Sequence, residues 1–155
     1  MSRVWDWESG EGLLRLDDPG EWDSAFERGE AHLGTAVIGL ANHCSPAEAS
    51  PRIARAMRLP DAAQWGFAFT AAGHVARLNG ELTPELYAAL RAEGHGGAAE
   101  HAIRDTLTFV PFRKLPPWFK RRWVYVAARD RLEAWWLRCV YAAEDAWRAA
   151  RGRRS

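Results

Sequence analysis

The sequence has only two cysteines, no long apolar run and almost no net charge. Cys44 and Cys139 stand far apart without the spacing of metal ligands, so we expect buried free thiols, and a disulfide between them has no support. No apolar run reaches the roughly eighteen residues that a membrane-spanning helix needs. The N-terminal residues include acidic side chains and no apolar segment typical of a signal peptide. We therefore expect a cytoplasmic protein with no membrane partner.

Motifs that carry chemistry are also missing. The sequence has no phosphate-binding glycine loop and no Gly-x-Ser-x-Gly elbow. His101 and Asp105 stand four residues apart in a predicted helix, and His74 lies in the equivalent helix of the preceding repeat. A tight metal site needs three or four converging ligands, and no further ligand occurs at a matching interval. We expect a surface hydrogen bond or ion pair there, and no metal, cofactor or catalytic residue.

The net charge of +1 conceals two oppositely charged parts. Residues 1–112 contain 9 basic and 16 acidic side chains, whereas residues 113–155 contain 12 basic and 4 acidic ones. Either the basic segment neutralises the acidic one within the molecule, or it binds an acidic partner such as nucleic acid. We favour neutralisation, because basic helices are more often solvated surfaces than binding sites.

A repeated pairing of a capping residue with proline predicts the fold. Ser50-Pro51 returns thirty-three positions later as Thr83-Pro84, and Asp18-Pro19 precedes it by thirty-two. A side-chain oxygen at the cap accepts a hydrogen bond from a backbone N–H, and proline suits the first helical position. Each pair is therefore predicted to begin a helix. A second helix should follow each one, at about Glu30 to His43, Asp61 to Leu78 and Gly97 to Phe109.

These helices predict an all-α fold of the α-solenoid type, with three helix pairs over residues 18–110. The small residues Ala68, Ala71, Ala72 and Gly73 should let a neighbouring helix approach closely, and Asn79-Gly80 should end their helix in a left-handed turn. Residues 1–17 should form an irregular arm, with Trp5 and Trp7 pinned onto the body. Residues 111–155 should belong to the same domain and cap the helix pairs.

The C-terminal segment is predicted to be one long helix that is rich in tryptophan. It runs from Trp118 to about Ala150 without glycine or proline and would extend about 50 Å. Five of the nine tryptophans lie in it and spread over more than one face. Large exposed aromatic patches are uncommon on soluble monomers, so the arm, the helix pairs or a second copy of the chain should cover them.

The segment Trp65–Gly80, with Glu93 to Phe109 after it, resembles the repeats of bacterial HEAT-like proteins. Leu59-Pro60-Asp61 is similar to their inter-helix turn, and the resemblance covers about residues 30–110. Where such repeats often have a valine followed by an arginine, this chain has Gln64-Trp65, so an arginine ladder between repeats is not expected. The resemblance implies a toxin-neutralising, immunity-type or scaffold protein, and a separate HEAT-like group consists of DNA glycosylases.

Two sets of residues are candidates for binding a partner. Trp65, His74 and Arg77 would line one side of the repeats, since Trp and Arg are enriched in interface hot spots. The second set is a basic-aromatic block from Arg113 to Trp123, where positive charge and stacking surfaces suit nucleic acid as well as a packed helix start. Its candidate residues are Arg113, Lys114, Trp118, Lys120, Arg121 and Arg122.

Taken together, the sequence favours a non-catalytic protein-binding module, most concretely of the immunity or scaffold type, with another protein such as a toxin as its partner. An acidic repeat surface would suit a basic partner. One alternative is a nucleic-acid-binding protein of the HEAT-like DNA glycosylase type that uses the basic-aromatic block. The other alternative is a structural subunit that forms a homodimer through the C-terminal helix.

Overall fold

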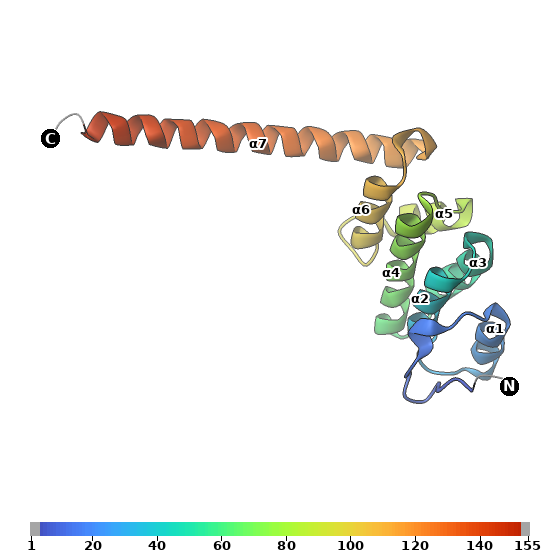
Figure 1. The fold of residues 1–155 in the computed structure, drawn as a ribbon. Helices are drawn as coiled ribbons and strands as arrows, with labels where there is room; N and C mark the ends of the chain where they lie inside the picture. The colour runs from blue at the N-terminus through green and yellow to red at the C-terminus, as the bar shows by residue number, and fades with distance from the viewer. Residues whose placement is uncertain (1–3, 153–155) are drawn as a thin grey trace. The chain divides into compact units, whose positions relative to one another are not determined.

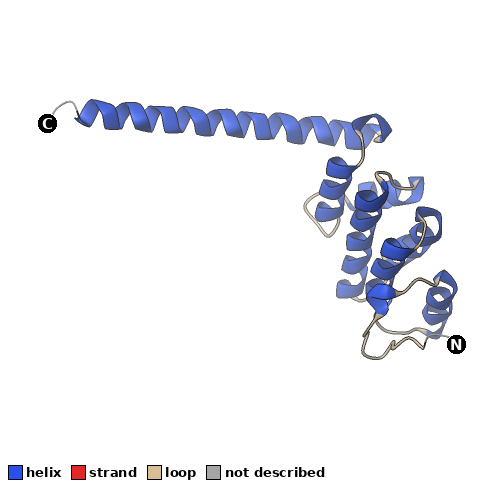
Figure 2. Ribbon diagram, viewed as in Figure 1, coloured by secondary structure: helices blue, strands red, loops and turns tan. Residues whose placement is uncertain are grey.

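The computed structural model describes residues 4–152, which fold into seven α-helices and two 3-10 turns without a β-strand (Figures 1 and 2). The all-α prediction is confirmed. The chain divides into two compact units, Met1–Pro116 and Pro117–Ser155. The helices of the first unit are α1 (Pro19–Arg28), α2 (Leu33–His43), α3 (Pro46–Ala56), α4 (Ala62–Asn79), α5 (Pro84–Glu93) and α6 (Glu100–Phe109). The 3-10 turns are η1 (Leu13–Arg15) and η2 (Phe112–Lys114), and the second unit is the single helix α7 (Pro117–Gly152).

The six helices of the first unit form two layers (Figure 1). Helices α2, α4 and α6 pack side by side in one layer, and α1, α3 and α5 follow one another in the second. Contacts of α2 with α1 and α3, and of α3 with α4, join the layers. The core consists of the buried faces of these helices, with Trp22, Leu40, Ile53, Val75, Leu86 and Leu90 fully buried. This arrangement is the stacking of helix pairs that the sequence predicts.

Two of the three predicted cap-and-proline starts are confirmed. Asp18 accepts hydrogen bonds from the backbone N–H groups of Gly20 and Glu21 at the start of α1, and Thr83 accepts one from Leu86 at the start of α5. In both helices proline occupies the first position, where no N–H is needed. Asp61 also caps α4, and the N–H of Gly80, at a φ of 64°, bonds to Ala76 and ends it.

The prediction that Ser50-Pro51 begins a helix is wrong. Helix α3 begins at Pro46, where Ser45 and Glu48 form a reciprocal capping box that satisfies two backbone N–H groups. Pro51 therefore lies inside α3, and Ser50 is buried with its hydroxyl unbonded. The observed caps at Asp18, Ser45 and Thr83 are 27 and 38 residues apart. The even spacing inferred from the proline pairs is thus not kept.

The second helix of each pair follows the prediction to within a few residues. Helix α2 begins at Leu33 instead of about Glu30, because Gly29 and His32 both adopt left-handed conformations before it. Helix α6 begins at Glu100 instead of Gly97, after the left-handed Gly94 and Gly96. Helix α4, at Ala62–Asn79, differs from the prediction by one residue at each end.

Three glycines allow close approaches of α2 to α4, of α2 to η1 and of α4 to α6. A Cβ on Gly34 of α2 would overlap the backbone carbonyl of Gln64 in α4, and one on Gly39 would overlap the Leu13 carbonyl of η1. At Gly73 of α4 the Ala102 Cα of α6 lies 3.4 Å from the Cβ position. The close approach predicted from the small residues of α4 is therefore present.

The N-terminal arm is attached to the first unit by buried side chains. Trp7 is buried, and its indole Nε1 donates to Glu21 Oε1 at 2.9 Å, whereas Trp5 is half-buried. Leu13 and Leu16 are fully buried in and after η1. Pinning of the arm is thus confirmed for Trp7. Residues 1–3 of the predicted arm lie outside the described part of the chain.

Helix α7 contains 36 residues, of which Phe119 alone is buried. Every residue after Phe119 in its described length is exposed or half-exposed. None of the described helices has the length and apolar content to span a membrane. The two cysteines are free, as expected, but Cys44 is half-buried and Cys139 is exposed, so the expectation of buried thiols is wrong. That α7 caps the helix pairs, and shares one domain with them, stays a prediction.

The glycine contacts predict opposite effects for two glycine-to-alanine substitutions. Gly39→Ala forces a methyl group to within 2.8 Å of the Leu16 backbone nitrogen and should destabilise the first unit by about 1–3 kcal/mol. Gly66→Ala in α4 is the matched control, because its Cβ meets no atom within 4 Å, and it should stabilise the helix by about 0.5–1 kcal/mol. Urea unfolding measures both values, and equal effects of the two substitutions would contradict the packing.

Candidate functional site

The residues predicted to bind a partner are divided between the two units. Trp65, His74 and Arg77 lie in α4 of the first unit, and Arg113 and Lys114 lie in η2. Trp118, Lys120, Arg121 and Arg122 lie in the first turns of α7, in the second unit. The basic-aromatic block is therefore interrupted by the unit boundary between Pro116 and Pro117.

The three α4 residues do not share one face. Trp65 precedes His74 by nine positions, which is two and a half turns at about 3.6 residues per turn, so the two side chains leave α4 on opposite sides. Trp65 is half-exposed and packs edge-on against Phe69, with ring centroids 5.7 Å apart. His74 and Arg77 are one turn apart and do lie on the same side. A surface that includes all three residues is thus absent from α4.

Arg77 connects α4 to α6. Its Nη2 lies 3.1 Å from Asp105 Oδ2, and its guanidinium lies over the Phe109 ring at 5.3 Å. An equivalent pair joins α3 to α1, where Arg52 Nε donates to Asp23 Oδ1 at 3.1 Å. Cross-helix arginine pairs therefore occur in this chain, although the residues at Gln64-Trp65 gave no reason to expect them. Such partly exposed pairs fix geometry more than they add stability.

His74 joins α4 to α2 through a hydrogen bond. Its Nδ1 lies 2.9 Å from Asn42 Oδ1, and since this oxygen can only accept, the ring donates from Nδ1. Burial lowers the pKa of His74 below its ordinary value of 6.5, the Arg77 charge lowers it further, and Asp105 opposes both. The neutral imidazole is therefore the form that fits the folded structure.

Asp105, one of the three residues considered as metal ligands with His74 and His101, forms an ion pair. In residues 4–152 no three His, Cys, Asp or Glu side chains are grouped so as to hold a metal ion. The carboxylate of Asp105 instead accepts from Arg77, and His101 is exposed on α6. Asp105 thus forms an ion pair with Arg77 of α4, and the helix-surface contact expected between His101 and Asp105 stays a prediction.

The basic-aromatic block presents its charges in several directions. Lys114 Nζ bonds to Glu81 Oε2 at 3.0 Å, and Arg113 is exposed beside it in η2. Lys120, Arg121 and Arg122 are consecutive residues of α7, so each is turned by about 100° from the one before. Arg122 lies over the Tyr125 ring at 5.3 Å, and Trp118 packs edge-on to Phe119 at 4.8 Å. The three cations of α7 therefore do not form a one-sided groove.

A cavity of about 380 Å³ in the first unit was missed by sequence reasoning. It lies where the end of α1, the start of α2 and the α3–α4 turn meet. Its apolar lining is Phe26, Leu33, Leu59 and Pro60, and its polar lining includes Glu30, His32, Asp61 and Gln64. No motif could reveal it, because three separate segments contribute. The amide oxygen of Gln64 also accepts from the N–H groups of Gly34 and Thr35, and so caps α2 from another helix.

His32, which lines this cavity, has an unusual backbone conformation. It has a φ of 63°, the one left-handed conformation of a non-glycine residue in the described chain. Such a conformation is uncommon for a histidine and persists only where the surroundings hold it. Here its ring lies against Gly10, where an added Cβ would meet it at 3.0 Å. The strain therefore has a structural explanation in the packing of the N-terminal arm.

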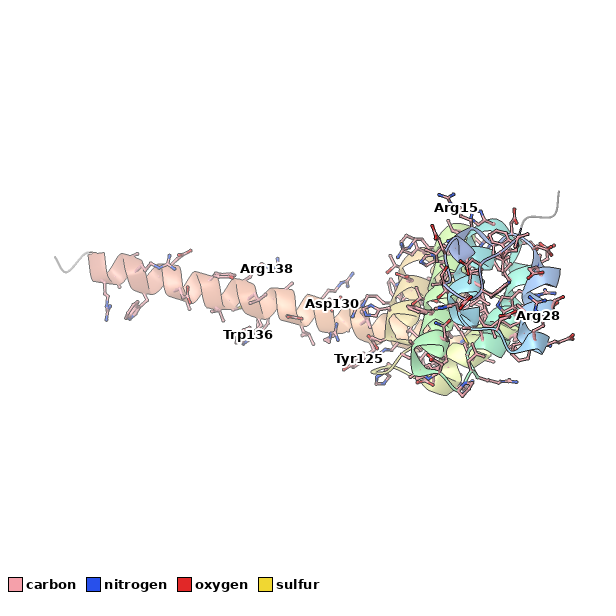
Figure 3. All side chains as sticks on the ribbon, turned by 90° about the horizontal axis from the view of Figure 1, so that it is seen from below. Arg15, Arg28, Tyr125, Asp130, Trp136 and Arg138 are labelled. Atoms are coloured by element: carbon pink, nitrogen blue, oxygen red, sulfur yellow. The ribbon has the colours of Figure 1, made fainter. Side chains whose placement is uncertain are left out.

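The largest set of exposed apolar side chains lies on α7. Its members are Trp123, Val124, Tyr125, Leu132, Trp135, Trp136, Leu137, Tyr141 and Trp147. Leu132 is 67% exposed and Trp135 is 61% exposed. In Figure 3 Tyr125 and Trp136 project from one side of α7 and Arg138 from the other. The sequence predicted an excess of aromatic residues over more than one face, and these side chains are exposed along α7.

Comparisons with known proteins gave no match to a protein family, to a curated protein or to a solved structure. The resemblance to HEAT-like repeats therefore stays a prediction.

The lowered pKa of His74 predicts a pH dependence of stability. Because the folded state disfavours the protonated ring, the stability that neutral His74 contributes is complete above pH 6.5 and is lost as the pH falls through its folded value. The loss in unfolding free energy between pH 7.5 and pH 5 should be smaller in His74→Gln than in the native chain. His101→Gln, an exposed histidine of α6, is the control and should keep the native slope. Equal slopes for all three proteins would rule out this role of His74.

Proposed function

We propose that the protein is a non-catalytic binding module that holds another protein chain through the exposed apolar surface of α7. The observation that carries this proposal is the exposure of nine large apolar side chains on one helix. Aromatic residues bury about 150–250 Å² each in an interface. Large exposed apolar patches on water-soluble proteins mark interaction sites.

The composition of α7 fits an interface better than a solvated helix. Tryptophan, tyrosine and arginine are the residues most enriched in interface hot spots, and α7 combines all three. Arg122 lies over Tyr125, and Arg151 lies 3.7 Å from the centre of the Trp147 ring. These contacts place the aromatic rings of Tyr125 and Trp147 beside arginine side chains that can form ion pairs with acidic groups of a partner.

The concrete versions of this function are a toxin-neutralising or immunity-type protein and a scaffold. The first unit supports a basic protein as partner, because residues 1–112 carry 16 acidic against 9 basic side chains. Charge complementarity of this kind speeds association and favours partners of the opposite sign. In this proposal α7 supplies the contact area, and the acidic first unit helps to select the partner.

Nucleic acid is the second candidate partner, favoured by the charge of α7. Within Pro117–Gly152 there are eight Lys and Arg side chains against four Asp and Glu, and aromatic rings lie between them. A positive surface with stacking rings is what single-stranded nucleic acids require. The dispersion of Lys120, Arg121 and Arg122 around the helix makes a continuous phosphate track harder to form.

Replacing two aromatic residues of α7 tests the proposed function. Trp135→Ala/Trp136→Ala should reduce the recovery of co-purifying protein from the native host by about tenfold or more, because hot-spot side chains carry most of the binding energy. Leu78→Ala is the matched control, since Leu78 is an exposed apolar residue of α4. Recovery is measured by quantitative mass spectrometry, and circular dichroism checks that α7 stays helical. Unchanged recovery with the double substitution would contradict the proposal.

The nucleic-acid candidate predicts a strong dependence on salt. Retention on heparin and on single-stranded DNA should fall steeply with salt and should be abolished by Arg121→Glu/Arg122→Glu, because counterion release provides most of such binding. Retention that is equal for the native chain and this variant would exclude nucleic acid as the partner of α7.

A further inference from the structure

We propose that the chain held by α7 is the α7 of a second copy, in an antiparallel pair whose two-fold axis passes level with residue 137. This inference rests on the proposed function and names the partner of the same surface. It follows from three features of α7: a charge-free stripe, the sizes of the side chains along it, and the charges beside it.

The stripe follows the seven-residue period of paired helices. Its first set of positions recurs every seven residues, and its second set lies three residues after each member of the first. The first set is Tyr125, Leu132, Cys139 and Ala146, and the second is Ala128, Trp135, Ala142 and Ala149. All eight are uncharged and exposed. The apolar residues elsewhere on α7, such as Trp123, Leu137 and Tyr141, are interspersed with charges instead.

The side-chain sizes along the stripe fit an antiparallel partner. The large residues Tyr125, Leu132 and Trp135 lie in its first half, and the second half contains only cysteine and alanine. With the axis level with residue 137, Tyr125 faces the partner's Ala149, and Leu132 faces the partner's Ala142. Trp135 then faces the partner's Cys139. Each of these layers joins a large side chain to a small one, as dense packing requires.

A parallel pair in register would pack poorly. Trp135 would face the partner's Trp135, and Tyr125 would face the partner's Tyr125, which crowds those layers. Ala128, Ala142, Ala146 and Ala149 would each face the same alanine of the partner and leave a gap, whereas the antiparallel pair has such a layer only where Ala128 faces the partner's Ala146. Both crowding and gaps are destabilising. The order of large and small residues therefore selects the antiparallel direction.

The flanking charges also favour this register. In an antiparallel pair Arg131 lies beside the partner's Asp145, and the two-fold axis repeats this ion pair on the same flank at the other end of the pair. Asp145 already bonds to Arg148 of its own helix, with Nη1 and Oδ1 2.9 Å apart, so its carboxylate is held on the surface. Trp136 lies beside the partner's Trp136. One contact is unfavourable, because Arg138 meets the partner's Arg138 near the axis.

The area available suits a stable dimer. Tyr125, Leu132, Trp135 and Trp136 are 57%, 67%, 61% and 60% exposed. Covering them in both chains removes on the order of 1,000 Å² from water, which with the small residues approaches the size of a specific interface. The two Pro117 residues would then be about 60 Å apart along the pair. Each first unit is thus attached at its own end, where it can bind separately.

Disulfide formation between two single-cysteine variants of the full chain tests the register. Both variants lack the native thiols through Cys44→Ser and Cys139→Ser, and one contains Leu132→Cys while the other contains Ala142→Cys. After mixing and mild oxidation, a covalent dimer should form between the two variants and not within either one alone. Glu133→Cys mixed with Ala142→Cys is the matched control and should stay uncoupled, because Glu133 lies off the stripe.

The mass of the purified chain is the second test of the antiparallel pair. Light scattering should give twice 17.4 kDa, and Leu132→Glu should weaken the dimer at least about 100-fold because it places a charge in a packed layer. Ala134→Glu, at an exposed alanine on the other side of α7, should leave the dimer intact. Coupling of Leu132→Cys with itself would overturn the proposal in favour of a parallel pair. If the chain is monomeric but still binds another protein through Trp135, the antiparallel pairing of α7 is overturned and the proposed function stands. If the chain is monomeric and binds no protein, the proposed function is overturned as well.

Discussion

The surface of α7 imposes the main constraint on this protein. A helix of 36 residues that buries only Phe119 has little of the apolar packing from which most helical stability in proteins comes. In the account proposed above, another chain covers these apolar residues and stabilises the helix. The uncharged stripe of α7 has large residues in one half and small ones in the other, so the surface that covers it must be complementary to this order of sizes. The first unit, by contrast, has its own core and needs no partner to bury Trp22, Ile53 or Leu86.

Local chemistry in the sequence was enough to predict most of the helices. Asp18, Asp61 and Thr83 cap the helices that follow them, and Gly80 ends α4, because short polar side chains and glycine act on backbone groups close by. The same chemistry led to one error. Ser45-Pro46 and Ser50-Pro51 are both acceptable starts, and only the glutamate at position 48 completes a capping box for the first. The prediction relied on the spacing of the proline pairs and did not include this capping box.

Features that depend on distant segments could not be predicted in this way. The cap that Gln64 provides for α2 joins residues about thirty positions apart, and nothing in the local sequence of either segment announces it. The cavity beside Phe26 and Leu59 has the same origin. Among the candidate binding residues, helix geometry alone separates Trp65 from His74, and that separation was available from their spacing. The pairing of Arg77 with Asp105 needed the α4–α6 contact, which Gly73 permits.

Hydrogen exchange in α7, measured at several protein concentrations, tests the central claim most directly. If another copy covers the stripe, backbone amides from about residue 124 to 149 should be protected at high concentration and should lose protection together on dilution, while the core of the first unit stays protected. Protection of α7 that is the same at every concentration, or absent at all of them, would contradict the account.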